Sequence, residues 1–442
     1  MSGGFHAGGL VKRLGSRGVP WTGVWGLADQ SLVSATNFIT MVLLARTLAP
    51  RDFGVFLLVY TAALFLNELQ KSLITRPHNV LAASLSERSY ATYTGTAAAL
   101  QMSFAGLWCL LALAAGLLAH VSNWGPAALF VALGPAVLAW QLQEFLRQTF
   151  YTKGLAEKAL VCDIVSYGGQ AVLIVLLFSA GRLTGVSALY ALAGTSALSA
   201  MCGFWLVRGD MSRPQWGKLR ESWQFGRWLL GDSVGGWLSA QLYPLLTAAI
   251  VGVSGVAVLR AVQNLVAPGH IVMNALVAYG VPRAARVQDR QGSAAMKSFV
   301  FGAWAVAAAP LIAYWLIVSV LAVPALKLLY GETYAAYGPL VGLTAVVYCA
   351  HFVTLGQSTT LLALGRTNAL FGGRLVAIAV TFTAGIVLVW LFGVYGAVIG
   401  SALSFLGLGL YLAHALRRRE TSAQGAATVS TSRGGLAIEG DI

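Results

Sequence analysis

The chain has 442 residues, of which 57% are hydrophobic and only 10% are charged. Soluble proteins carry about 25% charged residues, so this composition excludes a large soluble domain and predicts an all-α polytopic membrane protein. The net charge of +14 follows the membrane topology described below, so it does not indicate a nucleic-acid partner.

Apolar stretches long enough to cross a bilayer recur along almost the whole chain. A hydrocarbon layer about 30 Å thick needs about 20 residues per crossing helix. The clearest case is 375–416, which contains no Asp, Glu, Lys or Arg and is interrupted only by a glycine-rich turn at 392–396. We predict twelve helices, at 24–48, 53–73, 92–119, 124–147, 158–180, 184–207, 228–252, 255–281, 298–322, 335–363, 368–391 and 394–416.

The basic residues are distributed unequally between alternate loops. When the N-terminus is assigned to the cytoplasm, 24 of the 29 Lys and Arg residues fall on the cytoplasmic side. This positive-inside pattern predicts cytoplasmic termini and an even number of spans. We therefore expect a multi-pass protein of the cytoplasmic (inner) membrane, surrounded by the lipid bilayer.

Enzyme and cofactor signatures are absent from the sequence. The four cysteines, Cys109, Cys162, Cys202 and Cys349, have no disulfide, redox or zinc-ligand spacing. No G-x-x-x-x-G-K-[ST] motif occurs, and the histidines are isolated from one another in sequence. We expect neither catalysis nor a cofactor.

The two halves of the chain share landmarks in the same order. They are Asp29 and Asp232, then Gly154 and Gly365, then Gly185 and Gly396, and the two glycine spacings are both 31 residues. Two six-helix halves in the same orientation predict a pseudo-two-fold axis along the membrane normal, with substrate between the halves. The expected organisation is a cytoplasmic segment 1–23, a bundle 24–207, a cytoplasmic linker 208–227, a second bundle 228–416 and a disordered cytoplasmic tail 417–442.

Five short segments carry a family resemblance. They are LARTLAPRDFGVF at 44–56, GVAVLR at 255–260, LYGETY at 329–334, LGRT at 364–367 and YGAVIG at 395–400. They resemble the polysaccharide transporters, or lipid-linked oligosaccharide flippases, of the multidrug/oligosaccharidyl-lipid/polysaccharide (MOP) exporter superfamily. The resemblance implies two six-helix bundles around a central cavity.

The same resemblance implies transport of a polyprenyl-pyrophosphate-linked glycan from the inner to the outer leaflet. Such transport feeds O-antigen (lipopolysaccharide), capsule or exopolysaccharide assembly, with a polysaccharide polymerase and glycosyltransferases as possible partners. The anionic lipid-linked glycan is then the substrate.

Arginines are the leading candidates for binding this anion. Arg260 lies about one and a half turns into a predicted helix, where its paired donors either grip a pyrophosphate or snorkel to the outer surface. Arg46 and Arg51 flank a short outer loop, where they either receive the anionic substrate or are solvated, with Asp52 adjacent to Arg51.

Acids and amides within spans are the remaining candidates, because polar groups there are costly unless they face water or a partner. Asp29 and Asp232 occupy corresponding places in the two halves. They are candidates for binding Na⁺ or H⁺, for hydrogen-bonding sugar hydroxyls, or for capping broken helix turns. Five amides suit sugar hydroxyls but also join helices in lipid, namely Gln30, Asn37, Gln241, Gln263 and Asn264.

Two other functions compete with glycolipid flipping. An H⁺- or Na⁺-coupled multidrug exporter of the same superfamily would use Asp29 and Asp232 against a cationic drug. A glycan-processing enzyme would need a sizeable outer loop with acidic or histidine groups, whereas the longest polar loop, around 208–227, is predicted to be cytoplasmic.

Overall fold

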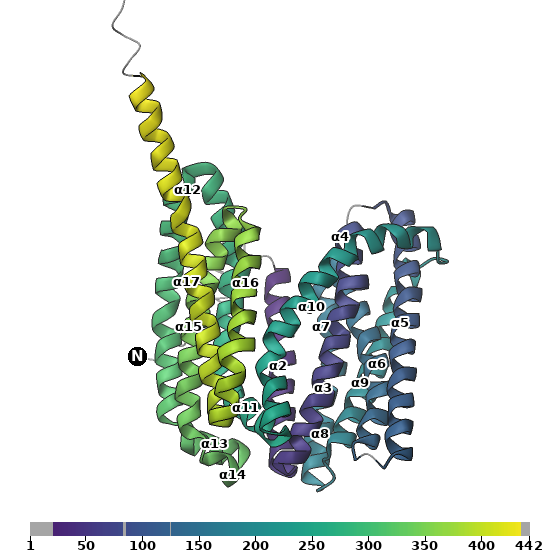
Figure 1. The fold of residues 1–442 in the computed structure, drawn as a ribbon. Helices are drawn as coiled ribbons and strands as arrows, with labels where there is room; N and C mark the ends of the chain where they lie inside the picture. The colour runs from purple at the N-terminus through teal and green to yellow at the C-terminus, as the bar shows by residue number, and fades with distance from the viewer. Residues whose placement is uncertain (1–20, 83–84, 124, 435–442) are drawn as a thin grey trace, which may run out of the picture. The chain divides into compact units, whose positions relative to one another are not determined.

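The computed structural model describes residues 21–82, 85–123 and 125–434, and this part of the chain is helical without a strand. It divides into two compact units, Met1–Leu238 and Ser239–Ile442, with the boundary inside helix α10 (Figure 1). Each unit is described by itself. The predicted domain bounds at 207, 227 and 416 stay predictions.

Unit 1 is a bundle in which α5, α6 and α9 pack together, as do α2 and α7. Two π-helical turns, η1 and η3, carry the chain without a break from α3 into α4 and from α7 into α8. Its helices are α2 (Trp21–Thr47), α3 (Pro50–Gln70), η1 (Lys71–Thr75), α4 (Arg76–Leu81), α5 (Glu87–Val121), α6 (Ala127–Thr152), α7 (Ala156–Asp163), η3 (Ile164–Gly168), α8 (Gly169–Ser179), α9 (Gly185–Val207), η4 (Arg208–Asp210), η5 (Trp216–Lys218) and the first part of α10 (Leu219–Ile250).

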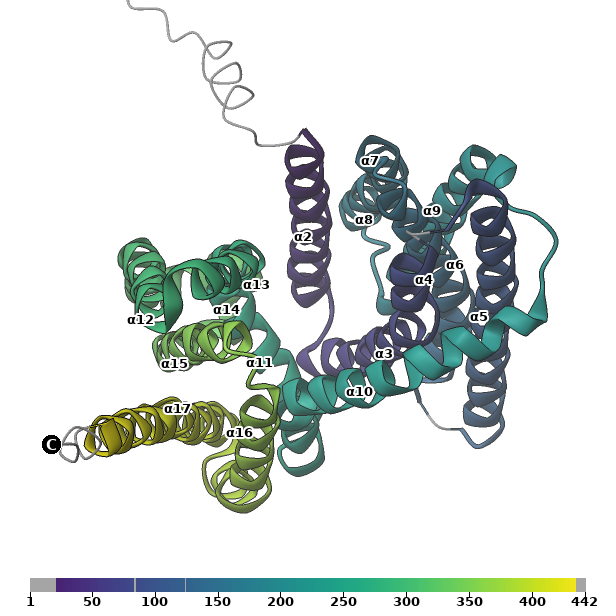
Figure 2. The same cartoon turned by 90° about the horizontal axis from the view of Figure 1, so that it is seen from above.

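Unit 2 is built around α15, which packs against α11, α12 and α17, and the view in Figure 2 runs along these helices. Its elements after α10 are α11 (Val253–Val266), α12 (Gly269–Val320), α13 (Ala322–Tyr330), α14 (Glu332–Ala335), α15 (Gly338–Ala363), α16 (Thr367–Val380), η6 (Thr381–Gly385) and α17 (Ile386–Gly434). Another π-turn, η6, joins α16 to α17.

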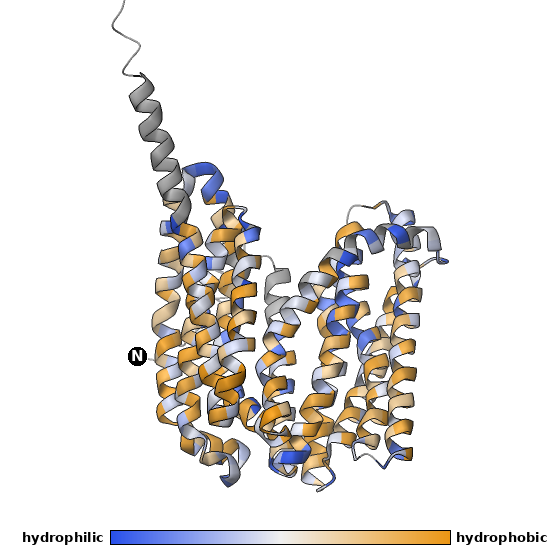
Figure 3. Cartoon of the chain, in the orientation of Figure 1, coloured by the Kyte–Doolittle hydropathy of each residue, from blue (hydrophilic) through white to orange (hydrophobic). Residues whose placement is uncertain are grey.

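The helices present apolar side chains outward, as a lipid environment requires. Within the described residues, eight helices are long and apolar enough to cross a membrane, and α11 is a shorter apolar helix. Hydrophobic residues cover the lengths of the helices in both units, and hydrophilic ones gather toward their ends (Figure 3). The chain is therefore an all-α multi-pass membrane protein, as predicted, while the count of twelve crossings stays a prediction.

A helical segment is present at each of the twelve predicted ranges, although several boundaries differ. The predicted helix 255–281 is broken, because Pro268 has no N–H to continue α11, which ends at Val266. Helix α10 begins at Leu219, inside the predicted linker. The predicted helix 53–73 corresponds to α3, which continues through η1 and α4 to Leu81 instead of ending near 73.

Gly154 and Gly365, which the sequence comparison of the two halves matched, have the same backbone geometry. They follow α6 and α15 with φ angles of 72° and 68°. In both turns the N–H after the glycine donates at 2.9 Å to the carbonyl five residues earlier, as in a Schellman cap. Because many helices end in this way, the repeat between the two halves stays a prediction.

Gly292 divides the 52-residue α12 into two straight helices, because its φ of 82° and ψ of 178° are non-helical. A Cβ at Gly292 or at Gly302 would meet no atom within 4 Å, so the two positions differ mainly in backbone conformation. We expect Gly292→Ala to destabilise the protein by about 1–3 kcal/mol, and Gly302→Ala to be neutral or slightly stabilising. Melting temperatures of the two purified variants in detergent test this, and equal values would contradict the kink.

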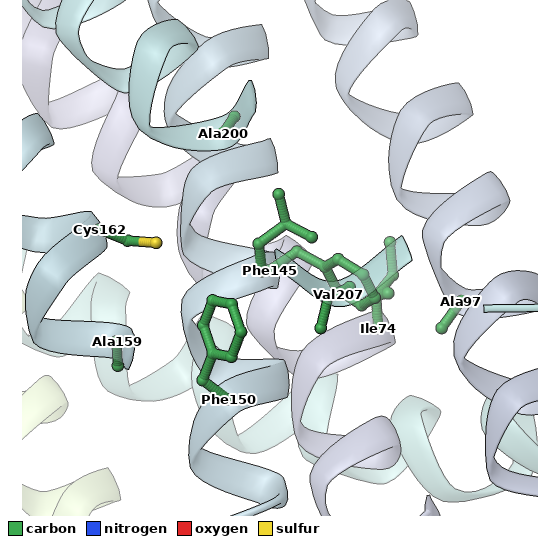
Figure 4. Packing of buried hydrophobic residues seen from close by; sticks show 9 residues of the cluster. Ile74, Ala97, Phe145, Phe150, Ala159, Cys162, Ala200 and Val207 are labelled. Carbon is green, nitrogen blue, oxygen red and sulfur yellow. The ribbon is translucent and has the colours of Figure 1, made fainter. Parts of the chain in front are cut away.

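A buried hydrophobic cluster fixes the C-terminal part of α6, around residues 145–150. Phe145 and Phe150 of α6 are 1% and 0% exposed and pack with Ile74, Cys162 and Val207 (Figure 4). These three partners come from η1, α7 and α9. The cluster therefore holds α6 at a defined rotation and depth against its neighbours.

Candidate functional site

Arg147 of α6 lies inside unit 1 among three carboxylates. Its guanidinium is 2.8 Å from Glu144 Oε2, 3.3 Å from Asp29 Oδ2 and 3.1 Å from Asp163 Oδ2. Side-chain exposure is 11% for Arg147 and at most 4% for the three acids. The acids come from α2, α6 and α7, so one cation joins three helices.

Helix periodicity explains how α6 presents this cluster. Glu144, Arg147 and Tyr151 are spaced by three and four residues and share one face. The Tyr151 hydroxyl donates to Asp29 Oδ2 at 2.6 Å, and Gln143 Nε2 donates to Asp163 Oδ1 at 2.6 Å. We call Asp29, Glu144, Arg147 and Asp163 the unit 1 charge cluster.

The charge cluster binds its acids internally but offsets their charge only in part, because one guanidinium faces three carboxyl groups. A guanidinium stays charged in proteins and offers five donors, so it can serve several carboxylates at once. Asp29 retains one buried oxygen, Oδ1, without a hydrogen bond. The other oxygen, Oδ2, is bound by both Arg147 and Tyr151. A Na⁺ ion or a cationic drug would therefore bind Asp29 next to the positive charge of Arg147.

Unit 2 contains an arginine in a very different setting. Arg260 of α11 is half-buried, and within the described chain it forms no hydrogen bond or ion pair. It is close enough to Tyr330 and Tyr348 to interact electrostatically with both. Asn264, one turn later, donates to the Tyr330 hydroxyl at 3.1 Å. The structure therefore brings Arg260 and Asn264, both predicted site residues, to one tyrosine.

Two histidines extend this aromatic setting. The His270 ring centroid is 4.7 Å from that of Tyr348 and 5.4 Å from that of His351. His351 in turn stacks on Phe405 at 4.7 Å. We call Arg260, His270, His351 and Tyr348 the unit 2 basic cluster.

The other predicted site residues are placed separately. Arg46 and Arg51 are exposed at the end of α2 and the start of α3, and no ion pair joins Arg51 to its neighbour Asp52. Gln30 is exposed, and the half-buried amides are Asn37 in α2, Gln241 in α10 and Gln263 in α11. The side chain of Asp232 lies outside the described residues.

Some basic residues on the predicted cytoplasmic side are paired with acids. Arg147 is buried as described, Arg76 pairs with Glu68 at 3.3 Å, and Lys153 pairs with Asp210 at 2.6 Å. In the described part of the chain, no group of three His, Cys, Asp or Glu side chains is arranged to hold a metal ion.

The sequence analysis predicted Asp29 and Arg260 as site residues but not Arg147, His270 or His351. The spacing of Glu144 and Arg147 was a usable signal for an internal ion pair. His270 and His351 are 81 positions apart, so no local pattern could have paired them.

Comparison with known proteins gives one family match. The family described as "Polysaccharide biosynthesis protein" matches residues 43–339. A search of curated protein sequences finds no match.

Solved structures match over nearly the whole chain at low identity. An inward-facing multidrug resistance MATE family transporter of the MOP superfamily matches with a TM-score of 0.70 at 14% identity, covering 88% of this chain and 94% of that one. An outward-facing structure of such a transporter gives 0.62 at 14% identity, covering 90% and 94%.

A third structure is a MOP superfamily transporter from Pyrococcus furiosus Vc1 (DSM3638), described as having a binding pocket of reverse polarity that suggests a different function. It matches with a TM-score of 0.60 at 13% identity, covering 88% of this chain and 93% of that one. At these identities the matches establish the MOP transporter fold.

Proposed function

Because this chain belongs to the polysaccharide biosynthesis protein family within the MOP exporter superfamily, we propose that it exports an anionic polyprenyl-pyrophosphate-linked glycan. The glycolipid moves from the inner to the outer leaflet of the cytoplasmic membrane by alternating access, and both termini are cytoplasmic. The product feeds a cell-surface polysaccharide, with a polymerase as a partner.

The observation that carries this proposal is the contrast between the unit 1 charge cluster and the unit 2 basic cluster. The acids of the unit 1 charge cluster are bound to Arg147, whereas Arg260 in unit 2 forms no ion pair in the described chain. A charged group among membrane helices is costly unless it faces a partner or water, so an unpaired arginine suits a transient anionic ligand. A guanidinium also binds phosphate through two parallel donors.

A cation-coupled multidrug exporter is the second candidate, because the multidrug transporters above share the fold. That function needs an acid available to a drug, Na⁺ or H⁺. Of the two acids predicted to bind an ion, Asp29 is the one whose side chain the structure describes. It already contacts Arg147 and Tyr151, so it is less available to a cation, which favours the anionic substrate. The reverse polarity described for the Pyrococcus furiosus transporter offers a precedent within the superfamily for a change of substrate.

Deletion of the gene tests the proposal. We expect the deletion strain to accumulate polyprenyl-linked oligosaccharide on the cytoplasmic leaflet and to lose surface polysaccharide, with both restored by the intact gene. Lipid extracts are compared after labelling of the outer leaflet with a membrane-impermeant reagent. Unchanged glycolipid together with new sensitivity to cationic drugs would move the assignment to multidrug export.

A further inference from the structure

His270 and His351 form a close pair in unit 2 that neither the sequence motifs nor the family match explains. Their rings meet edge-to-face, with 5.4 Å between centroids and 73° between planes. Both residues are half-buried, on α12 and α15 respectively. Two half-buried imidazoles placed together, without an ion-paired acid, are an unusual use of costly polar groups within a membrane helix bundle.

The surroundings of the pair are aromatic and basic. From α15, Tyr348 contacts His270, and from α17, Phe405 stacks on His351. From α11, Arg260 interacts with Tyr348. No described carboxylate lies within ion-pair distance of either histidine or of Arg260. The described ring contacts of the pair are therefore to Tyr348 and Phe405, and no described carboxylate forms an ion pair with either histidine.

Neighbouring hydrogen-bonding groups on α12 are already occupied by the backbone of α11. The Tyr314 hydroxyl donates to the Leu265 carbonyl at 2.7 Å, and Trp315 Nε1 donates to the Val266 carbonyl at 3.3 Å. These two bonds hold α12 against α11, the helix that carries Arg260. Neither imidazole forms a side-chain hydrogen bond in the described chain, so the pair remains available to a ligand.

Resting on the proposed function, we propose that Arg260, His270 and His351 together bind the phosphate groups of the lipid-linked substrate. At least one of the two histidines takes up a proton from water when the anion binds. Arg260 supplies a permanent positive charge and shares Tyr348 as a neighbour with His270. An imidazolium in this pair, which no carboxylate neutralises, is stabilised by the bound phosphate. No covalent bond changes, and the proton returns to water when the anion leaves.

This arrangement makes anion binding dependent on pH in a defined direction. Lower pH favours the imidazolium, so the protein binds a phosphate more tightly there. A probe with a terminal phosphate changes charge near pH 6, where that phosphate loses its last proton, whereas a pyrophosphate esterified at both ends has no such proton. The pH dependence of the binding affinity must therefore be compared between wild type and variants with the same probe.

The test measures binding to the purified full-length protein in detergent by calorimetry at pH 6 and pH 8. The probes are geranylgeranyl pyrophosphate and inorganic pyrophosphate, which separate a lipid headgroup from a free anion. The variants are the double substitution His270→Gln/His351→Gln, Arg260→Ala, and the control His120→Gln, whose histidine is exposed at the end of α5. Melting temperatures show whether each variant is folded.

We expect the double variant to bind geranylgeranyl pyrophosphate about tenfold more weakly than wild type at pH 6, with a smaller difference at pH 8. The control should match wild type, and proton uptake, seen as a buffer-dependent heat, should vanish in the double variant. Tight binding of inorganic pyrophosphate as well would assign the site to the phosphates rather than the prenyl chain.

Two results would overturn the inference, and both can be told apart from failure of the proposed function. One is a folded double variant with wild-type affinity at both pH values, and the other is wild-type binding without proton uptake. If either occurs while Arg260→Ala still loses binding, the flippase proposal stands without the histidines. If wild type binds neither probe, this inference fails, while the deletion strain decides the function separately.

If the double variant unfolds, His351→Asn alone takes its place. It keeps a side-chain donor next to Phe405 and removes only the group that gains a proton. Wild-type affinity for geranylgeranyl pyrophosphate at both pH values, in this variant and in His270→Asn, would again contradict the proposal.

Discussion

Arg147→Ala should destabilise unit 1 by about 3–5 kcal/mol, the usual cost of leaving buried charges without their partner. The substitution removes the only cation that contacts Asp29, Glu144 and Asp163 in the described chain. Three acids on α2, α6 and α7 would then face one another in a site from which water is largely excluded. The melting temperature and yield of the purified protein measure the effect.

Matched variants distinguish the charge cluster from a general loss of packing. Arg147→Lys should recover only part of the stability, because a compact ammonium cannot present a planar fork to three carboxylates. The double variant Arg147→Ala/Asp163→Asn should also recover part of the stability, because it removes one of the three unpaired acids. Lys153→Ala breaks a partly exposed ion pair to Asp210, so it should cost only about 0–1 kcal/mol. Equal melting temperatures for Arg147→Ala and Lys153→Ala would contradict this account.

Arg260→Ala should reduce export about 10–100-fold while leaving the fold intact. The guanidinium contributes charge-assisted hydrogen bonds to a phosphate, each worth roughly 1.5–3 kcal/mol. Its removal breaks no ion pair in the described chain, so the protein should melt near the wild-type temperature. Surface polysaccharide in a complemented deletion strain measures export.

A matched control for Arg260 lies in the same unit. Lys327 pairs with Glu332 at an exposed position, with side-chain exposure of 60% and 73%, so Lys327→Ala should leave export unchanged. Arg260→Lys should retain an intermediate rate, because a point charge replaces a bidentate one. Wild-type export by folded Arg260→Ala would remove the main support for an anionic substrate.

Local sequence patterns were sufficient for the helical class and for most helix positions. Charge-free apolar runs such as 375–416 require spans wherever they occur. Pro268 alone predicts the break after Val266, whereas the apolar residues on both sides of it predict one continuous helix. The continuation of α3 to Leu81 was harder to foresee, because polar residues there, such as His78, are buried by tertiary packing.

The site could be predicted only where its contacts are local. Arg260 and Asn264 are one helical turn apart, and both adjoin Tyr330. Arg147 was assigned to a cytoplasmic loop because a basic residue near a helix end is usually solvated. Its actual position depends on Asp29 and Asp163, which are 118 and 16 residues away in the chain. Partners on separate helices leave no periodic signal, and the same holds for His270 and His351.

The measurement that tests the central claim most directly is translocation in vesicles containing only the purified protein. A fluorescently labelled polyprenyl-pyrophosphate-linked oligosaccharide is incorporated, and an impermeant quencher follows its movement between leaflets. We predict faster exchange with wild type than in protein-free vesicles, with most of the gain lost in Arg260→Ala. Exchange no faster than in protein-free vesicles, from folded wild-type protein that instead transports a cationic drug, would contradict the account.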